Sequence, residues 1–145
     1  MTPERLVIGI GNPDRGDDAA GVRVARRVHG GRAIEWADCS VLMELWDAHD
    51  DVIIVDAMNS GLPPGTVCRF DALTEQLPAR AFPSSHAFGV AETVELARSL
   101  GRLPERLTVY GIEVSDLEIG AHLSDEVADA VERLASEIDA ELGGS

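Results

Sequence analysis

The fold of this chain is decided near its start, by the stretch Leu6-Val7-Ile8-Gly9-Ile10-Gly11-Asn12-Pro13-Asp14-Arg15-Gly16-Asp17-Asp18. Leu6–Gly11 is short and apolar, as in a buried β-strand, and Ala19–Val28 has apolar residues at helical spacing. A nucleotide-binding turn between such elements would present glycines and free backbone amides to a phosphate. Here the turn ends in two carboxylates, Asp17 and Asp18, which repel phosphate and suit a cation. The loop therefore favours a metal ion or acid–base chemistry over a dinucleotide.

Apolar and amphipathic stretches alternate along the rest of the chain, which is the pattern of an α/β sandwich. The pattern predicts further strands at Ala33–Trp36, Asp51–Ala57, Thr66–Phe70 and Arg106–Val114. It predicts further helices at Val41–Trp46, from Ser84 or Ser85 to Leu100, and from a Ser124-Asp125-Glu126 cap to about Leu142. Gly101 ends the second of these helices, and Asp71–Pro83 is expected to be an irregular surface loop.

These elements predict a fold of the α/β class. The connection from Asp51–Ala57 to Thr66–Phe70 is short and rich in turn residues, so Thr66–Phe70 should pair antiparallel or lie at an edge. We expect residues 1–145 to form a single-domain three-layer sandwich, in which helices flank a mixed, mostly parallel sheet of about five strands.

Composition excludes several classes of function. The formal net charge of −14 argues against nucleic acid and anionic membranes as partners, because no basic face is available for phosphates. No stretch approaches the roughly 20 apolar residues of a membrane helix, and the N-terminus lacks the pattern of a signal peptide. Cys39 and Cys68 fit neither a disulfide framework nor a metal-binding spacing. We therefore expect a cytoplasmic protein with reduced thiols.

Three segments bring polar residues to the predicted carboxyl edge of the sheet, where sites of open α/β sheets gather. Asp17 and Asp18 follow the first strand, Asp56 ends the most apolar strand, and His86 opens a helix. Taken singly, an Asp before a helix is commonly an N-cap, and a lone His is commonly a cap or a packed ring. Asp56 is harder to explain structurally, because a carboxylate there is costly unless it is paired or binds a cation. Together, two carboxylates and one imidazole suit zinc, nickel or cobalt with open coordination positions.

The same residues resemble a known family. The matching stretches are Val7–Asn12, Gly16–Val22, Val55-Asp56-Ala57, Ser85–Val90, Val109–Glu113 and Gly120–Ser124, in that order. They are similar to hydrogenase maturation proteases, the endopeptidases that trim the C-terminus of the [NiFe]-hydrogenase large subunit. The resemblance implies that Asp18, Asp56 and His86 are the family's two metal-contacting acids and its histidine.

The resemblance also implies whose metal these residues contact. They would engage the nickel already inserted in the large-subunit precursor, so the protease would carry no metal of its own. An open ligand set of this kind also takes up zinc, cadmium or nickel adventitiously. Water activated by a carboxylate, as in an aspartic-type endopeptidase, or polarised through the metal, would cut the peptide bond.

One stretch departs from the family pattern. The family commonly has an Asp followed by two glycines after its second strand, whereas this chain has Asp38-Cys39-Ser40. The departure bears on the type of substrate more than on activity. Two other functions stay open: a hydrolase that holds its own divalent metal with the same three residues, and a non-catalytic binder of the hydrogenase precursor.

Overall fold

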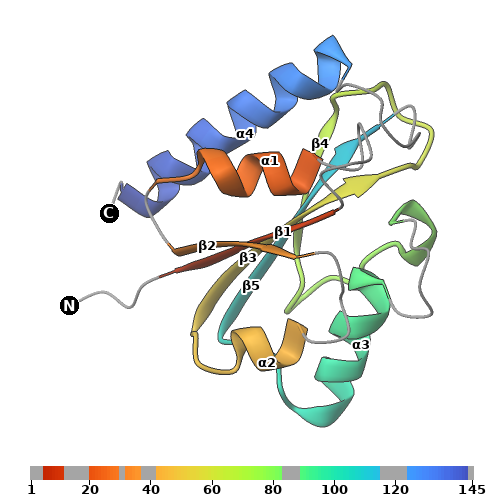
Figure 1. Cartoon of the computed structure of the whole chain (residues 1–145). Coiled ribbons are helices and arrows are strands. Elements are labelled where there is room, and N and C mark those ends of the chain that lie inside the picture. Colours follow the sequence, from red (N-terminus) through yellow and green to blue (C-terminus); the bar gives the residue numbers. More distant parts are fainter. Residues whose placement is uncertain are drawn as a thin grey trace.

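The computed structural model describes residues 5–11, 20–29, 32–36, 42–82, 89–114 and 124–143. Its centre is a five-stranded sheet in the order β2-β1-β3-β5-β4 (Figure 1). The strands are β1 (Leu6–Ile10), β2 (Arg32–Trp36), β3 (Asp51–Met58), β4 (Val67–Asp71) and β5 (Arg106–Glu113). All neighbours pair in parallel except β4, which pairs antiparallel with β5 at the edge. This confirms the predicted mixed, mostly parallel sheet and its antiparallel edge strand.

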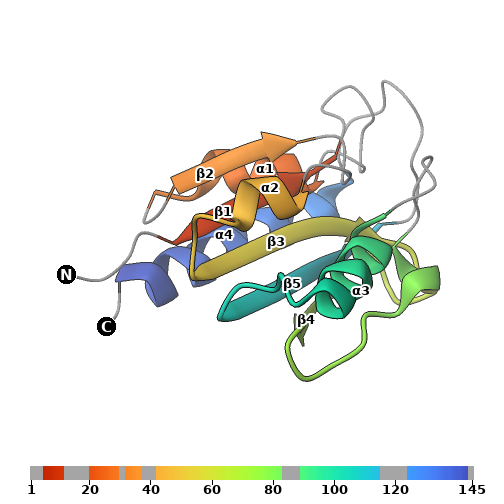
Figure 2. The same cartoon turned by 90° about the horizontal axis from the view of Figure 1, so that it is seen from below.

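Helices cover both faces of the sheet (Figures 1 and 2). The helices α1 (Ala20–Arg27) and α4 (Asp125–Gly143) lie on one face, and α2 (Leu42–Trp46) and α3 (Val90–Leu100) lie on the other. A short 3-10 turn, η3 (Ala79–Ala81), precedes α3. The three-layer arrangement follows the prediction. Within the described ranges, none of these helices has the length and apolar character needed to cross a membrane.

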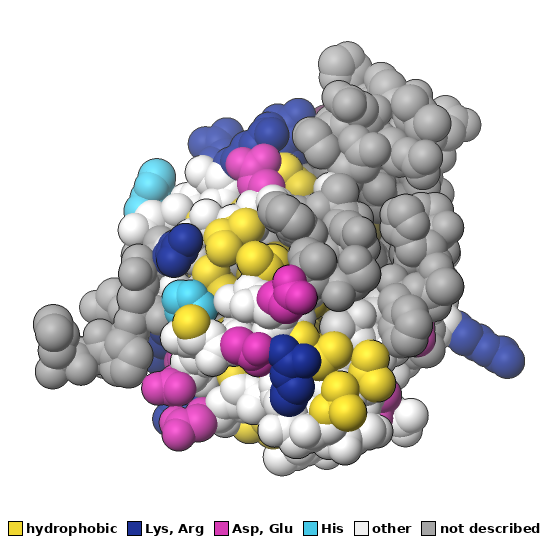
Figure 3. Space-filling model, turned by 60° about the horizontal axis from the view of Figure 1, so that its bottom comes forward, with side chains coloured by type: hydrophobic (Ala, Val, Ile, Leu, Met, Phe, Trp, Pro, Cys, Tyr) yellow, Lys and Arg dark blue, Asp and Glu magenta, His cyan; other side chains and the backbone are white. Residues whose placement is uncertain are grey.

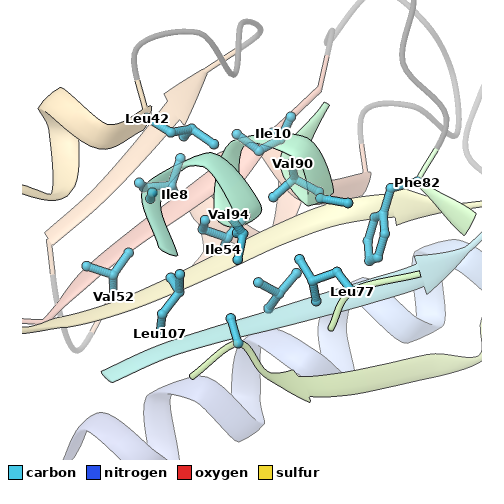
Figure 4. Packing of buried hydrophobic residues seen from close by; sticks show 14 of the residues in the cluster. Ile8, Ile10, Leu42, Val52, Ile54, Leu77, Phe82, Val90, Val94 and Leu107 are labelled. Atoms are coloured by element: carbon cyan, nitrogen blue, oxygen red, sulfur yellow. The ribbon is translucent and has the colours of Figure 1, made fainter. Parts of the chain in front are cut away.

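Two hydrophobic cores explain why β3 is apolar along almost its whole length. Val52, Ile54 and Met58 belong to the core beneath α2 and α3, which Figure 4 shows from close by. Ile53 and Val55 alternate with them and belong to the core beneath α1 and α4. A strand that is covered on both faces must be apolar at consecutive positions, because successive side chains point to opposite faces.

The start of α3 differs from the prediction. The helix begins at Val90 with Gly89 as its N-cap, not after Ser84 or Ser85. The backbone N–H of Gly89 donates to Glu92 Oε1 at 3.2 Å, so the helix's own third residue satisfies the cap. The predicted end is confirmed, because Gly101 adopts the left-handed conformation with φ of 67°.

The segment after β4 is also more ordered than predicted. The sequence suggested an irregular surface loop over Asp71–Pro83, but Ala72, Leu77 and Phe82 are buried in the core beneath α3. The Arg98 guanidinium binds this segment, donating to the carbonyl oxygen of Ala72 at 2.6 Å. Scattered apolar residues without helical or strand spacing therefore serve as anchors of a packed connection.

Candidate functional site

Asp56 is a buried carboxyl near the carboxyl end of β3. Only 7% of the residue is exposed, and its alternation with Ile54 and Met58 places it on the sheet face covered by α2 and α3. Its Oδ1 accepts a hydrogen bond of 2.8 Å from the backbone N–H of Ala57. The sequence placed Asp56 at the end of the strand; β3 continues through Met58, so Asp56 lies just inside the sheet edge.

A glycine on the neighbouring strand lets an aromatic ring pack beside Asp56. Gly111 of β5 pairs directly with Asp56. A Cβ at Gly111 would lie 2.8 Å from the Met58 sulfur and 3.2 Å from the Phe82 ring, so both side chains occupy the space over the glycine. Phe82 is 2% exposed and is the last described residue before the stretch that contains His86. The chain therefore enters that stretch next to Asp56.

The chain leaves the same stretch on the same face of the sheet. Gly89 and Val90 resume the described structure at the start of α3, and Val90 is fully buried. Val90 belongs to the same core cluster as Ile10, the last residue of β1, and Figure 4 labels both. Both flanks of the His86 segment are thus anchored in the core layer to which Asp56 belongs.

A second glycine brings the start of α1 against the backbone that precedes Asp56. A Cβ at Gly21 would lie 2.3 Å from the carbonyl oxygen of Val55 and 2.5 Å from that of Ile10. Such close approach of a helix to two strands is available only to glycine. Because α1 begins at Ala20, two residues after Asp18, the described chain resumes here against the backbone that precedes Asp56, on the opposite face of the sheet from the Asp56 side chain.

The structure thus places one of the three predicted site residues and the flanks of the other two. Asp17, Asp18 and His86 lie outside the described residues, as does Cys39. Among the residues that are described, no group of three or more His, Cys, Asp or Glu side chains is arranged to hold a metal ion. What the described chain brings together is Asp56 with the ends of the segments that contain Asp18 and His86.

Glu113 is a second buried carboxyl at this edge, and it is not among the site residues predicted from the sequence. It is 1% exposed and shares the face of Asp56, since it pairs with Met58 in the β3–β5 register. Both of its oxygens accept the backbone N–H of Ser60, at 2.8 and 3.0 Å, and Oε1 also accepts the Ser60 hydroxyl. Its position at the end of the apolar strand Arg106–Val114 is the same signal that singled out Asp56.

The opposite face of the sheet carries a separate polar cluster. The Tyr110 hydroxyl donates to Glu141 Oε2 at 3.2 Å, and Arg69 lies 3.7 Å from the other oxygen of Glu141. Burial raises the pKa of the Tyr110 phenol above its ordinary value, although the hydrogen bond from Arg69 acts in the other direction. This cluster lies beneath α4 and takes no part in the edge around Asp56.

The outer surface over α2 and α3 has a mixed character. Figure 3 shows acidic, basic and hydrophobic side chains interspersed on this side of the molecule. Leu96 and Leu100 of α3 are 39% and 56% exposed. Scattered exposed leucines of this kind are common on protein surfaces.

Comparison with known proteins gives the family. The family model for the hydrogenase maturation protease HycI matches residues 37–141 of this chain. The chain belongs to the hydrogenase maturation protease family. The resemblance seen in the sequence motifs is thereby confirmed.

Relatives within this family share both sequence and fold. HupD of Rhizobium leguminosarum bv. viciae, a hydrogenase expression/formation protein, is 34% identical over 128 residues, which cover 80% of this chain and 62% of HupD. The maturation protease HybD from Thermococcus kodakarensis matches with a TM-score of 0.75 and 28% identity, over 96% of this chain and 98% of HybD. The maturating endopeptidase HybD from E. coli matches with a TM-score of 0.76 and 27% identity, over 97% of this chain and 92% of that protein.

The extent of these matches differs between relatives. The chain spans 62% and 63% of the lengths of the HupD proteins from Rhizobium leguminosarum bv. viciae and Thiocapsa roseopersicina. It spans nearly the whole of both HybD structures. The five-stranded mixed sheet with helices on both faces is therefore the fold of the maturation proteases themselves.

Proposed function

We propose that this protein is an endopeptidase that removes the C-terminal extension of a [NiFe]-hydrogenase large-subunit precursor. The observation that carries the proposal is the convergence at Asp56. Phe82 packs over Gly111, the strand partner of Asp56. Gly21 packs on the carbonyl oxygen of Val55, the residue before Asp56. These two contacts anchor the segments that lead to His86 and to Asp18. Family membership supplies the class of reaction, and the names of the matched HybD proteins support it.

The donor set suits the nickel of the precursor. Asp18, Asp56 and His86 would offer two carboxylates and one imidazole, which are ligands that nickel accepts. Burying a carboxylate is costly, and a cation at the carboxyl edge of the sheet would offset part of the cost of burying Asp56. The nickel belongs to the substrate, and the protein holds no resident cofactor. Zinc, cadmium or nickel from solution would bind the same residues adventitiously.

The chemistry follows from the same groups. A carboxylate, as in an aspartic-type endopeptidase, accepts a proton from water while the water oxygen attacks the carbonyl carbon of the scissile bond. The C–N bond then breaks, and the departing amine takes up a proton. The nickel of the precursor offers a Lewis acid that polarises the carbonyl. Docking on nickel would also restrict cleavage to precursors in which the metal has been inserted. We place this reaction in the cytoplasm.

The decisive experiment is incubation with candidate large-subunit precursors, with and without nickel. Mass spectrometry of the precursor reports loss of the C-terminal peptide. We expect cleavage of the nickel-loaded precursor alone. Tight stoichiometric metal in the purified protein would instead favour a hydrolase with its own metal. Stable binding of the loaded precursor without cleavage would favour a non-catalytic binder.

Matched variants connect the activity to the site. Asp56→Asn should abolish cleavage. Asp50→Asn is the control, because it makes the same chemical change at an exposed position next to the other end of β3. Equal loss of activity in both variants would show that the effect is not specific to the site.

A further inference from the structure

We propose that Glu113 is a positioning residue for the site around Asp56, a role that rests on the function proposed above. Glu113 is as deeply buried as the core residues around it, with 1% of its surface exposed. In the β3–β5 register it pairs with Met58, two positions beyond the Asp56–Gly111 pair, and therefore lies on the same face of the sheet. Its contacts show what it holds in place.

Glu113 holds both ends of the connection between β3 and β4. Its carboxyl group accepts the backbone N–H and the hydroxyl of Ser60, where the connection begins. Its backbone carbonyl accepts the N–H of Gly65 at 2.9 Å, and its own N–H donates to the carbonyl of Thr66 at 2.8 Å, where the connection ends. The side chain of Glu113 therefore holds the Ser60 end of the connection, and its backbone holds the end at Gly65 and Thr66.

The connection between β3 and β4 also contacts the segment that places Phe82 beside Asp56. The backbone N–H of Asn59 donates to the carbonyl oxygen of Ala81 at 2.7 Å, which ties the end of β3 to η3. Phe82 follows and packs over Gly111, the strand partner of Asp56. Holding Ser60 therefore restrains both the strand end that carries Asp56 and the turn that places Phe82.

A purely structural role does not require a carboxyl here. Within the described part of the chain, no Arg, His or terminal amine pairs with Glu113, and its partners are the two donors of Ser60. Replacing buried polar pairs by apolar groups of similar shape is often neutral for stability. What the carboxyl adds is a pair of directed acceptors that fix the position of Ser60. We therefore infer that Glu113 positions groups of the site and that its carboxyl is not needed to stabilise the core.

The test measures metal affinity as well as cleavage. Calorimetric titration with Cd²⁺, a probe for the ligand set around Asp56, is made on the full chain and on Glu113→Leu and Glu113→Gln. We expect the affinity to fall about tenfold in Glu113→Leu, as for other residues that orient metal ligands. Glu113→Gln keeps an acceptor for the Ser60 amide and should stay within about threefold of wild type, the value of one neutral hydrogen bond.

Three comparisons separate positioning from other roles. Glu105→Gln removes the same charge at an exposed position before β5 and should leave the affinity unchanged. In an Asp56→Asn background, Glu113→Leu should cause little further loss, because the ligand that it positions is already gone. Ser60→Ala removes only the hydrogen bond from the Ser60 hydroxyl to Glu113, so it tests this contact even if Glu113→Leu does not fold. It should lower the Cd²⁺ affinity less than Glu113→Leu does.

Several results would overturn the assignment. An equal loss in Glu113→Gln and Glu113→Leu would mean that charge matters and not the acceptor geometry. An equal loss with and without the Asp56 carboxylate would mean that Glu113 does not act on Asp56. Unchanged Cd²⁺ affinity in every variant would remove the role. These titrations need no precursor, so a failure of the proposed protease activity is recognised separately, by absence of cleavage in the wild type.

Amide hydrogen exchange tests the contact between the Glu113 carboxyl and Ser60 without any metal. The Ser60 amide should exchange about tenfold faster in Glu113→Leu than in the wild type, because its acceptor is lost. If wild-type protein fails to bind Cd²⁺, the metal part of the proposed function is wrong, and this exchange rate alone decides whether Glu113 holds Ser60. An unchanged exchange rate of the Ser60 amide would show that the Glu113 carboxyl does not hold Ser60.

Discussion

Gly21→Ala tests the close approach that brings α1 against the backbone before Asp56. The new Cβ would stand 2.3 Å from the carbonyl oxygen of Val55 and 2.5 Å from that of Ile10, where ordinary contact begins at about 3.4 Å. Both obstacles are backbone atoms of central strands, so no side-chain rotation relieves them. The helix must therefore move outward by about 1 Å, which is the difference between 2.3 Å and the ordinary contact distance of 3.4 Å.

The cost of this movement can be worked out from the packing of α1. A gap of 0.5–1 Å forfeits about a quarter to a half of each dispersion contact, and overpacking in a core costs about 1–3 kcal/mol. The buried residues of the helix, among them Val22, Val24 and Ala25, all lose part of their contact with the sheet. Replacing a helical glycine by alanine returns at most about 1 kcal/mol. We expect a net loss of about 2 kcal/mol in the free energy of unfolding.

Urea unfolding measures the stability, and the precursor cleavage assay measures the site. Because the stability of small domains is about 5–15 kcal/mol, the variant should still fold. Its processing rate should nevertheless fall about 100-fold, since a displacement of about 1 Å near reacting groups has that effect. Arg23→Ala, at an exposed position of the same helix, is the control and should stay within about 0.5 kcal/mol of wild type. A Gly21→Ala protein as stable as this control would refute the close approach.

Three further predictions address the remaining groups. Asp18→Asn and His86→Ala should each abolish processing with unchanged circular dichroism; wild-type turnover in either would remove that residue from the site. The purified protein should be largely metal-free, and nickel added to the protease alone should not permit cleavage of an empty precursor; efficient cutting of that precursor would contradict nickel recognition. Tyr110 is the chain's one tyrosine, so phenolate absorbance reports its pKa, which should lie above the ordinary value of about 10. The unfolded chain then loses this proton first, and stability should fall as pH rises above about 10, but not in Tyr110→Phe.

Elements that depend on local pattern could be predicted from the amino-acid sequence. Apolar residues at consecutive positions in Asp51–Ala57 predicted a strand covered on both faces. The short connection after it predicted that Thr66–Phe70 pairs antiparallel or lies at an edge; β4 does both, although its partner is β5 and not β3. The sequence also singled out Asp56, because a carboxyl at the end of so apolar a run needs a special reason. These features follow from alternation and spacing, which can be read along the chain.

Contacts between distant segments could not be predicted in this way, because they depend on how the elements pack. Phe82 is buried because Gly111, on the strand β5, leaves room for its ring. Glu113 and Ser60 are 53 positions apart, so no local pattern reveals that one holds the other. Residues far apart in sequence meet only when the sheet order β2-β1-β3-β5-β4 brings β3 and β5 together. Spacing along the chain identified Asp56, whereas packing across the sheet revealed the contacts around it.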